Sequence, residues 1–316
     1  MDTPRLDGEV LLSHVLGKNR IYLYTHYDQP LEQEELDRFR PLVIERAKGY
    51  SVASLTGKKD FMGLTFAVND KVLIPRPDTE TLVEYVLGAY HQQDSIRILD
   101  MCTGPGTILL SLLHYLPAAT GVGLDISRDA LIVANQNQES FKLENRSEFY
   151  ESDMFSYLEN HGELFDVIVS NPPYSIKWDG DDNPLLINDG RFSPAGVLAP
   201  KSKADLAFIM HALSWLSSSG TAAIVCFPGI FYRGGAEQKI RKYLVDNNFV
   251  DCIIQLPSNL FFGTSIATCI MVLKKNKKNN TTLFIDASQK YVKVTNNNRL
   301  TEDNIHEIVN IFTERK

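Results

Sequence analysis

The chain has 316 residues, more than one domain usually needs, and its 44% hydrophobic and 22% charged content is ordinary for a globular protein. The longest apolar runs are too short to span a bilayer and the polar start is unlike a signal peptide, so we expect a cytoplasmic protein without membrane contact. The net charge of −7 is concentrated in the first half, which weakly favours a basic protein partner over a phosphate backbone. Neither the four cysteines nor the seven histidines have metal-ligand spacing, so no metal site is predicted.

The first part of the chain is predicted to be helical. Apolar residues recur at helical spacing over residues 8–17 and 31–49. Pro41 should kink or divide the second of these helices, because it lacks a backbone N–H and clashes with the preceding turn. Together the two segments predict a small N-terminal helical domain over residues 1–58.

A β-hairpin is predicted next. The β-prone runs 61–68 and 71–74 flank the pair Asn69-Asp70, which is typical of a hairpin turn. Pro75-Arg-Pro ends the second run, and a helix is expected after it. Residues 59–90 are therefore predicted to form a hairpin and a linking helix.

Beyond residue 95 strand and helix candidates alternate, which favours a doubly wound α/β sheet. Seven strands, with no helix before the last, match the Rossmann-like sheet of methyltransferases. We expect that domain over 91–275, followed by a C-terminal extension over 276–316 with a short strand near 282–286. The strand candidates are 96–99, 120–124, 148–151, 165–169, 221–227, 250–256 and 266–273, and the helix candidates include 128–141, 203–217, 235–247 and 301–314.

A glycine-rich turn follows the first of these strands. Asp100 ends the strand, and the turn leads directly into an apolar helix. Such a turn lets a ligand approach the backbone at the C-terminal edge of the sheet, although glycine-rich turns that bind nothing are also common. Cofactor contacts are predicted along the turn, at Cys102, Thr103, Gly104, Pro105 and Gly106.

Two carboxylates end the next two strands. Asp125 lies 25 residues after Asp100, near the spacing at which a carboxylate binds a ribose diol; capping of the following helix is the alternative. Asp153 follows the third strand, at the position that faces the adenine of a bound cofactor in sheets of this kind. There Asp153 would accept a hydrogen bond from the adenine amine, and Met154 would pack against the ring. An ordinary aspartate at a strand end is the alternative there. These three residues extend the predicted cofactor site.

The motif Asn171-Pro172-Pro173-Tyr174 directly follows an apolar strand. An amide or exocyclic amine is hard to methylate because its lone pair is delocalised. The side-chain oxygen of Asn171 and the carbonyl of Pro172 would accept both N–H groups and free that lone pair, and the prolines stiffen the loop. Tyr174 offers a flat face and a cation–π attraction of roughly 0.5–2 kcal/mol to a sulfonium. The motif predicts methyl transfer to a planar nitrogen, with Asn171, Pro172 and Tyr174 catalytic, Pro173 completing the substrate contacts and Asn171 also touching the cofactor.

Residues 1–174 resemble the bacterial release factor glutamine N5-methyltransferases. The resemblance implies S-adenosyl-L-methionine as cofactor, an N-terminal domain that docks a peptide chain release factor, and an active site for the glutamine of its Gly-Gly-Gln loop. It also implies that Cys102 to Gly106, Asp125, Met154 and Asn171 contact the cofactor. The motifs that carry the likeness are Leu23-Tyr-Thr-His, Leu55-Thr-Gly-Lys-Lys-Asp-Phe-Met-Gly-Leu-Thr-Phe, Val72-Leu-Ile-Pro-Arg-Pro-Asp-Thr-Glu80, Ile98-Leu-Asp-Met-Cys-Thr-Gly, Asp125-Ile-Ser and Ser170-Asn-Pro-Pro-Tyr.

Residues 171–316 look instead like the modification subunit of type I restriction systems, a DNA adenine-N6 methyltransferase that works with a separate specificity subunit. The likeness is carried by residues 175–184, 191–205, 227–237 and 260–269. The two likenesses share Asn-Pro-Pro-Tyr, so the chain is interpreted as a hybrid. Pro105 departs from the usual glycine-rich turn, because it stands where a small residue is usual and removes a backbone donor.

Three functions follow as hypotheses. The first is methylation of the release factor glutamine, favoured because the cofactor turn, the hairpin and the docking domain resemble one family. The second is methylation of DNA adenine, with a specificity subunit as partner. The third is a catalytically silent binding subunit. Both amide and adenine present a planar –NH₂, so Asn171 to Tyr174 do not choose between the first two.

Overall fold

The computed structural model describes residues 4–92, 94–153, 156–260, 266–294 and 297–315. It divides into two compact units, residues 1–75 and 76–316. Each unit is described by itself below.

The first unit begins with four helices. The carboxylate of Asp7 in α1 lies 2.7 Å from Nε of Arg46 in α3, and Leu11 of α1 is buried against this bundle. Helix α3 runs continuously through Pro41, so the expected division there is wrong. Its start is held by a capping box between Glu32 and Glu35, and the helix extends far enough on both sides to absorb the one missing backbone hydrogen bond. The helices are α1 (Pro4–Leu16), α2 (Arg20–Thr25), α3 (Gln33–Ala47) and α4 (Val52–Thr56).

The hairpin of this unit pairs β1 (Lys58–Phe61) with β2 (Leu64–Ala67). The turn is therefore Met62-Gly63, and the expected turn at Asn69-Asp70 is wrong. Both turn residues have positive φ, 51° and 70°, as a two-residue turn that matches the twist of the strands requires. Glycine takes up this conformation without strain, which explains why the chain reverses at this pair.

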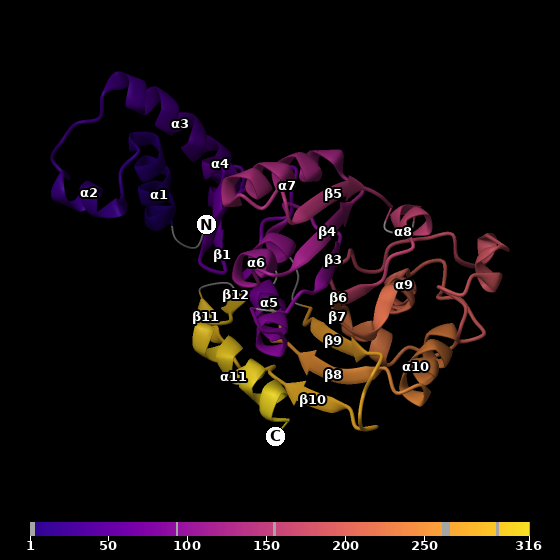
Figure 1. The fold of residues 1–316 in the computed structure, drawn as a ribbon. Coiled ribbons are helices and arrows are strands. Elements are labelled where there is room, and N and C mark those ends of the chain that lie inside the picture. Colours follow the sequence, from indigo (N-terminus) through magenta and orange to yellow (C-terminus); the bar gives the residue numbers. More distant parts are fainter. Residues whose placement is uncertain (1–3, 93, 154–155, 261–265, 295–296, 316) are drawn as a thin grey trace. The chain divides into compact units, whose positions relative to one another are not determined.

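The second unit is built on an eight-stranded sheet, in the order β10-β8-β9-β7-β6-β3-β4-β5 (Figure 1). Strand β9 runs antiparallel to β7 and β8, and the other neighbours are parallel. The predicted α/β fold is confirmed, and the short strand expected in the C-terminal extension joins the sheet as its eighth strand. The strands are β3 (Arg97–Met101), β4 (Thr120–Asp125), β5 (Ser147–Glu151), β6 (Phe165–Ser170), β7 (Leu216–Cys226), β8 (Val250–Gln255), β9 (Cys269–Lys274) and β10 (Leu283–Asp286).

Helices pack against this sheet, and α11, α5, α6 and α7 contact one another in that order. Among the described residues, no helix has both the length and the apolar character that a membrane span requires. The helices are α5 (Pro77–Ala89), α6 (Thr107–Tyr115), α7 (Arg128–Phe141), α8 (Ser156–His161), α9 (Asp205–Trp215), α10 (Ala236–Asp246) and α11 (Glu302–Glu314). Three short 3-10 helices (Gly180–Asp182, Leu186–Asn188 and Pro228–Phe231) and the strand pair β11 (Val292–Val294) and β12 (Asn297–Arg299) complete the unit.

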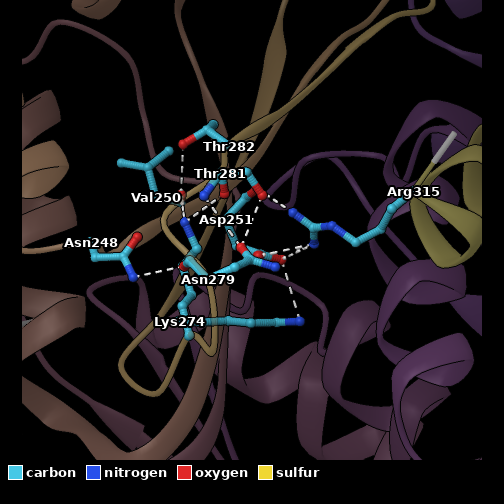
Figure 2. Close-up of polar contacts among 9 residues, drawn as sticks. Asn248, Val250, Asp251, Lys274, Asn279, Thr281, Thr282 and Arg315 are labelled. Atoms are coloured by element: carbon cyan, nitrogen blue, oxygen red, sulfur yellow. Dashed lines mark hydrogen bonds and ion pairs between the residues drawn. The ribbon is translucent and has the colours of Figure 1, made fainter.

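The C-terminal helix is tied to the sheet by an ionic cluster (Figure 2). Nη1 of Arg315 lies 3.0 and 3.2 Å from the two carboxylate oxygens of Asp251 in β8, whose side chain is 4% exposed. Nζ of Lys274 lies 3.3 Å from the same carboxylate. Nearby, Lys275 donates to the carbonyl of Leu216 and Lys277 to that of Val250. The ammonium groups of Lys274, Lys275 and Lys277, at and just after the end of β9, therefore bind to the neighbouring strands β7 and β8.

Candidate functional site

In the glycine-rich turn between β3 and α6, the two glycines have different surroundings, because there is free space at Gly104 and close packing at Gly106. Gly104 has φ 56°, and a Cβ added there would meet nothing within 4 Å. Gly106 has φ 78°, and an added Cβ would lie 3.0 Å from Leu110 and 3.1 Å from Phe149. Pro105 is anchored, because its carbonyl accepts a 2.9 Å hydrogen bond from Asn137 of α7. The turn is therefore fixed by packing, while its backbone at Gly104 stays accessible to a ligand.

Asp100, at the end of β3, is fully buried beneath this turn. Its Oδ2 accepts hydrogen bonds from the hydroxyl of Thr103 at 2.7 Å and from the backbone N–H of Leu109 at 3.3 Å. Its Oδ1 is buried and has no hydrogen-bond partner in the described part of the chain. Burial raises the pKa of this carboxyl to about 7, against the opposing effect of the Thr103 hydrogen bond.

This buried carboxyl predicts a specific pH dependence of stability. Between about pH 4 and 7 the folded protein holds a proton on Asp100 that the unfolded chain releases, so stability should fall as the pH rises and level off above pH 7. Relative to Asp100→Asn, we expect the wild type to lose about 2–3 kcal/mol of unfolding free energy between pH 5 and pH 8. Urea unfolding at both pH values measures this. The control is Asp129→Asn, which changes an exposed aspartate of α7 and should show the same pH dependence as the wild type. The prediction is contradicted if the difference in unfolding free energy between the wild type and Asp100→Asn is the same at both pH values.

Asp125, at the end of β4, faces the turn with both carboxylate oxygens engaged by backbone. Oδ2 accepts from the N–H of Gly104 at 2.8 Å, and Oδ1 accepts from the N–H of Ser127 at 2.9 Å. The cap of the following helix is Ser127, whose hydroxyl accepts from Ala130. Helix capping is thus supplied by Ser127, and each oxygen of Asp125 keeps a lone pair for a ligand hydroxyl.

The Asn-Pro-Pro-Tyr motif leaves β6 at the same edge of the sheet. The hydroxyl of Ser170 donates to the carbonyl of Met101 at 2.7 Å and links the ends of β6 and β3. The hydroxyl of Tyr174 donates to Oδ1 of Asn171 at 3.1 Å. Just beyond the motif, Ser175 has φ 52° and its N–H donates to Asp205 at 3.0 Å. The Asn171 oxygen is therefore accessible to a hydroxyl donor, and the loop that carries it is anchored to α9.

A cavity of about 370 Å³ lies at this edge, within the range usual for ligand sites. Of the predicted residues it brings together Cys102, Asp125, Asp153 and Pro173. Met154 lies outside the described residues. Among the described ones, the lining does not include Thr103, Gly104, Pro105, Gly106, Asn171, Pro172 or Tyr174.

Part of the lining was not predicted from the sequence. Ile126, directly after Asp125, is 73% exposed and lines the cavity. Its position next to Asp125, the carboxylate predicted to bind a ribose, was a usable signal. Most of the rest belong to the segments 175–184 and 191–205, which carried a family likeness but no assigned roles, and Leu186 and Phe208 lie outside them. Aromatic residues in the irregular part of this region have no spacing that marks them. These residues are Ile176, Lys177, Trp178, Asp179, Leu186, Arg191, Phe192 and Phe208.

The cavity suits an adenosine-containing ligand better than a metal ion. It has carboxylates at one side for hydroxyl and amine groups, and apolar and aromatic side chains for the faces of a ring. In the described part of the chain, no group of three or more His, Cys, Asp or Glu residues is arranged to hold a metal.

Comparison with known proteins finds two families. The sequence model of N-6 DNA methylases matches residues 69–316, and that of the PrmC N-terminal domain matches residues 1–57. The type I restriction enzyme MpnII methylase subunit of Mycoplasma pneumoniae is 44% identical over 77% of this chain. The match covers 47% of that subunit, so the chain spans about half its length.

A release factor glutamine methyltransferase from Shewanella oneidensis is 41% identical, over 66% of this chain and 71% of that enzyme. Among solved structures, the type I restriction-modification system methyltransferase subunit from Streptococcus thermophilus is 29% identical. It superposes with a TM-score of 0.72, over 90% of this chain and 58% of that one. The likeness to two families expected from the sequence is confirmed.

Proposed function

Because the chain belongs both to the N-6 DNA methylase family and to that of the release factor glutamine methyltransferases, and is thus an S-adenosyl-L-methionine-dependent methyltransferase, we propose that it methylates a planar –NH₂ group. The preferred acceptor is the side-chain amide (N5) of the glutamine in the Gly-Gly-Gln loop of a peptide chain release factor. The observation that carries the proposal is the position of Asn171, directly after β6, where its oxygen already accepts a hydrogen bond from the hydroxyl of Tyr174.

The chemistry rests on two acceptors. When bound, S-adenosyl-L-methionine supplies an electrophilic methyl group on a sulfonium sulfur. Asn171 Oδ1 exchanges its hydrogen bond from Tyr174 for one from the substrate –NH₂, and the carbonyl of Pro172 accepts the second N–H. The nitrogen lone pair is then localised and aimed at the methyl group. The new N–C bond forms as the S–C bond breaks, S-adenosylhomocysteine remains, and the nitrogen loses a proton to water.

The cofactor contacts are assigned by the same proposal. Asp125 accepts hydrogen bonds from the ribose hydroxyls, and Asp153 accepts one from the adenine amine. Cys102 and the backbone at Gly104 lie against the ligand. Both carboxylates and Cys102 line one cavity. Cys102 and Gly104 have positive φ values, and a Cβ added at Gly104 would meet nothing within 4 Å, which supports a close approach of the ligand to this backbone.

The acceptor preference rests on the N-terminal unit. We assign docking of the release factor to residues 1–58 and the link to the catalytic domain to 59–90; the catalytic domain spans 91–275 and the extension 276–316. The match of residues 1–57 to the PrmC N-terminal domain supports this assignment.

DNA adenine is the second candidate. It is favoured by one observation: the sequence model of N-6 DNA methylases matches residues 69–316, which include the whole lining of the cavity, from Cys102 to Phe208. In this case the chain would methylate N6 of adenine in DNA, with a specificity subunit as its partner.

A labelling experiment distinguishes these acceptors. With methyl-labelled S-adenosyl-L-methionine, we expect label in a class I release factor and none in unmethylated duplex DNA. A release factor whose Gly-Gly-Gln glutamine is replaced by glutamate is the matched control, because it lacks the –NH₂ group and should stay unlabelled. Label in DNA alone would reverse the preference, and cofactor binding without label in either would favour a silent subunit.

A further inference from the structure

The cavity is walled by two segments far apart in the sequence. One side carries Cys102, Asp125, Ile126 and Asp153, at the ends of β3, β4 and β5. The other side is formed largely by residues 176–192, here called the outer wall, which contributes Trp178, Leu186 and Phe192 among others. We propose that the outer wall is part of the cofactor site, and that Trp178 binds the adenine end of S-adenosyl-L-methionine through the face of its indole.

The arrangement of polar and apolar groups supports this role. The carboxylates of Asp125 and Asp153 can bind the hydroxyls and the amine of an adenosine but not the faces of its base. Ile126 offers an exposed apolar side chain at the cavity, and an aromatic side chain offers a face on which any base can stack. An adenine ring between Ile126 and an aromatic side chain would bury both of its faces, and its amine would donate to a carboxylate.

Trp178 presents its ring rather than its polar edge. Its indole N–H donates to the carbonyl of Pro200 at 3.1 Å, so the one polar atom of the side chain is already engaged. Phe192 lies 5.4 Å away between ring centroids, at 52°, and supports the indole. Phe192 in turn stacks on buried His211 of α9. The surface left to a ligand is the aromatic face.

The outer wall is held in place before any ligand binds. The N–H of Trp178 donates to the carbonyl of Lys201 at 3.0 Å, and the N–H of Ala204 donates to the carbonyl of Ile176 at 2.9 Å. Gly180 has φ 54°, and a Cβ added there would lie 2.8 Å from Lys201, so the two segments are in close contact. Such a fixed surface binds without an ordering cost. The inference rests on the methyltransferase part of the proposed function and not on the identity of the acceptor.

Tryptophan fluorescence tests the proposal directly, because the chain has two tryptophans, Trp178 and Trp215. The Trp215→Phe variant keeps Trp178 alone, and we expect its emission to change saturably when S-adenosylhomocysteine is added. The matched variant Trp178→Phe keeps Trp215, which is not among the cavity lining, and its emission should stay constant. Neither measurement uses a methyl acceptor, so a failed acceptor assignment leaves them unaffected.

Calorimetry gives a second readout on the same ligand. Trp178→Ala should raise the Kd for S-adenosylhomocysteine about tenfold, the loss expected for one stacked aromatic. Leu185→Ala, on the same segment but 77% exposed and outside the lining, should leave the Kd unchanged. The proposal is overturned if Trp215→Phe binds the ligand by calorimetry without a change in Trp178 emission. It is also overturned if the wild-type protein shows no binding at all.

Discussion

Replacing Asn171 by alanine is expected to lower kcat by about 10²–10³-fold, the effect of removing one preorganised polar group that acts on the transition state. The loss arises because one N–H of the acceptor loses its partner and the nitrogen lone pair stays delocalised. Cofactor affinity should change much less, since the carboxylates of Asp125 and Asp153 remain. Methyl transfer measured with labelled cofactor gives the rate, and calorimetry with S-adenosylhomocysteine gives the Kd.

The control for this variant is Asn135→Ala. Asn135 lies in α7 and its amide donates to the carbonyl of Leu131, away from the cavity, so its loss should leave kcat within about twofold. Circular dichroism should show both variants folded. Full turnover by Asn171→Ala would remove the two-acceptor mechanism, whichever acceptor the enzyme uses.

Breaking the ionic cluster of Figure 2 should have the largest effect on stability. In Arg315→Met, the nearly buried carboxylate of Asp251 keeps its ion pair with Lys274 and loses the one with the guanidinium. We expect the free energy of unfolding of the 76–316 unit to fall by about 2–4 kcal/mol, because a buried carboxylate loses its guanidinium partner. Urea unfolding measures the loss.

Two comparisons sharpen this expectation. Lys242→Met breaks an exposed ion pair with Asp246 in α10 and should cost about 0.5 kcal/mol or less. Adding Asp251→Leu to Arg315→Met removes the carboxylate that has lost its guanidinium partner and should recover part of the stability. If Arg315→Met were no worse than Lys242→Met, the cluster would be only a surface contact.

Local signals explain which elements were predictable. Helix α7 spans residues 128–141 as expected, because Ser127 caps its start and Lys142 ends it in the left-handed conformation. The hairpin turn was missed because Asn69-Asp70 has the right composition, whereas Met62-Gly63 satisfies the backbone geometry. Periodicity detected the strand at 282–286, but its pairing with β8 depends on contacts distant in sequence.

The candidate site was predictable where a motif directly follows a strand. Parallel strands bring Cys102, Asp125, Asp153 and the motif at Asn171 to one edge, so their proximity follows from the fold class. The outer wall was not predictable in the same way. It is irregular, and its position is set by hydrogen bonds such as that from Trp178 to Lys201, which link segments with no repeating pattern.

The strand order has a consequence for how such a chain arises. Strands β3, β4 and β5 lie on one side of β6, and β7, β9, β8 and β10 lie on the other. A genetic crossover within the codons for Asn171 to Tyr174 would thus exchange one contiguous block of the sheet for another. Among the described strands it would create one new ladder, between β6 and β7, besides new packing of β7 and α11 against α5. The two blocks also share one core, in which Leu99 and Met101 lie with Phe208 and Leu213, so a foldable product needs apolar surfaces that match across the junction.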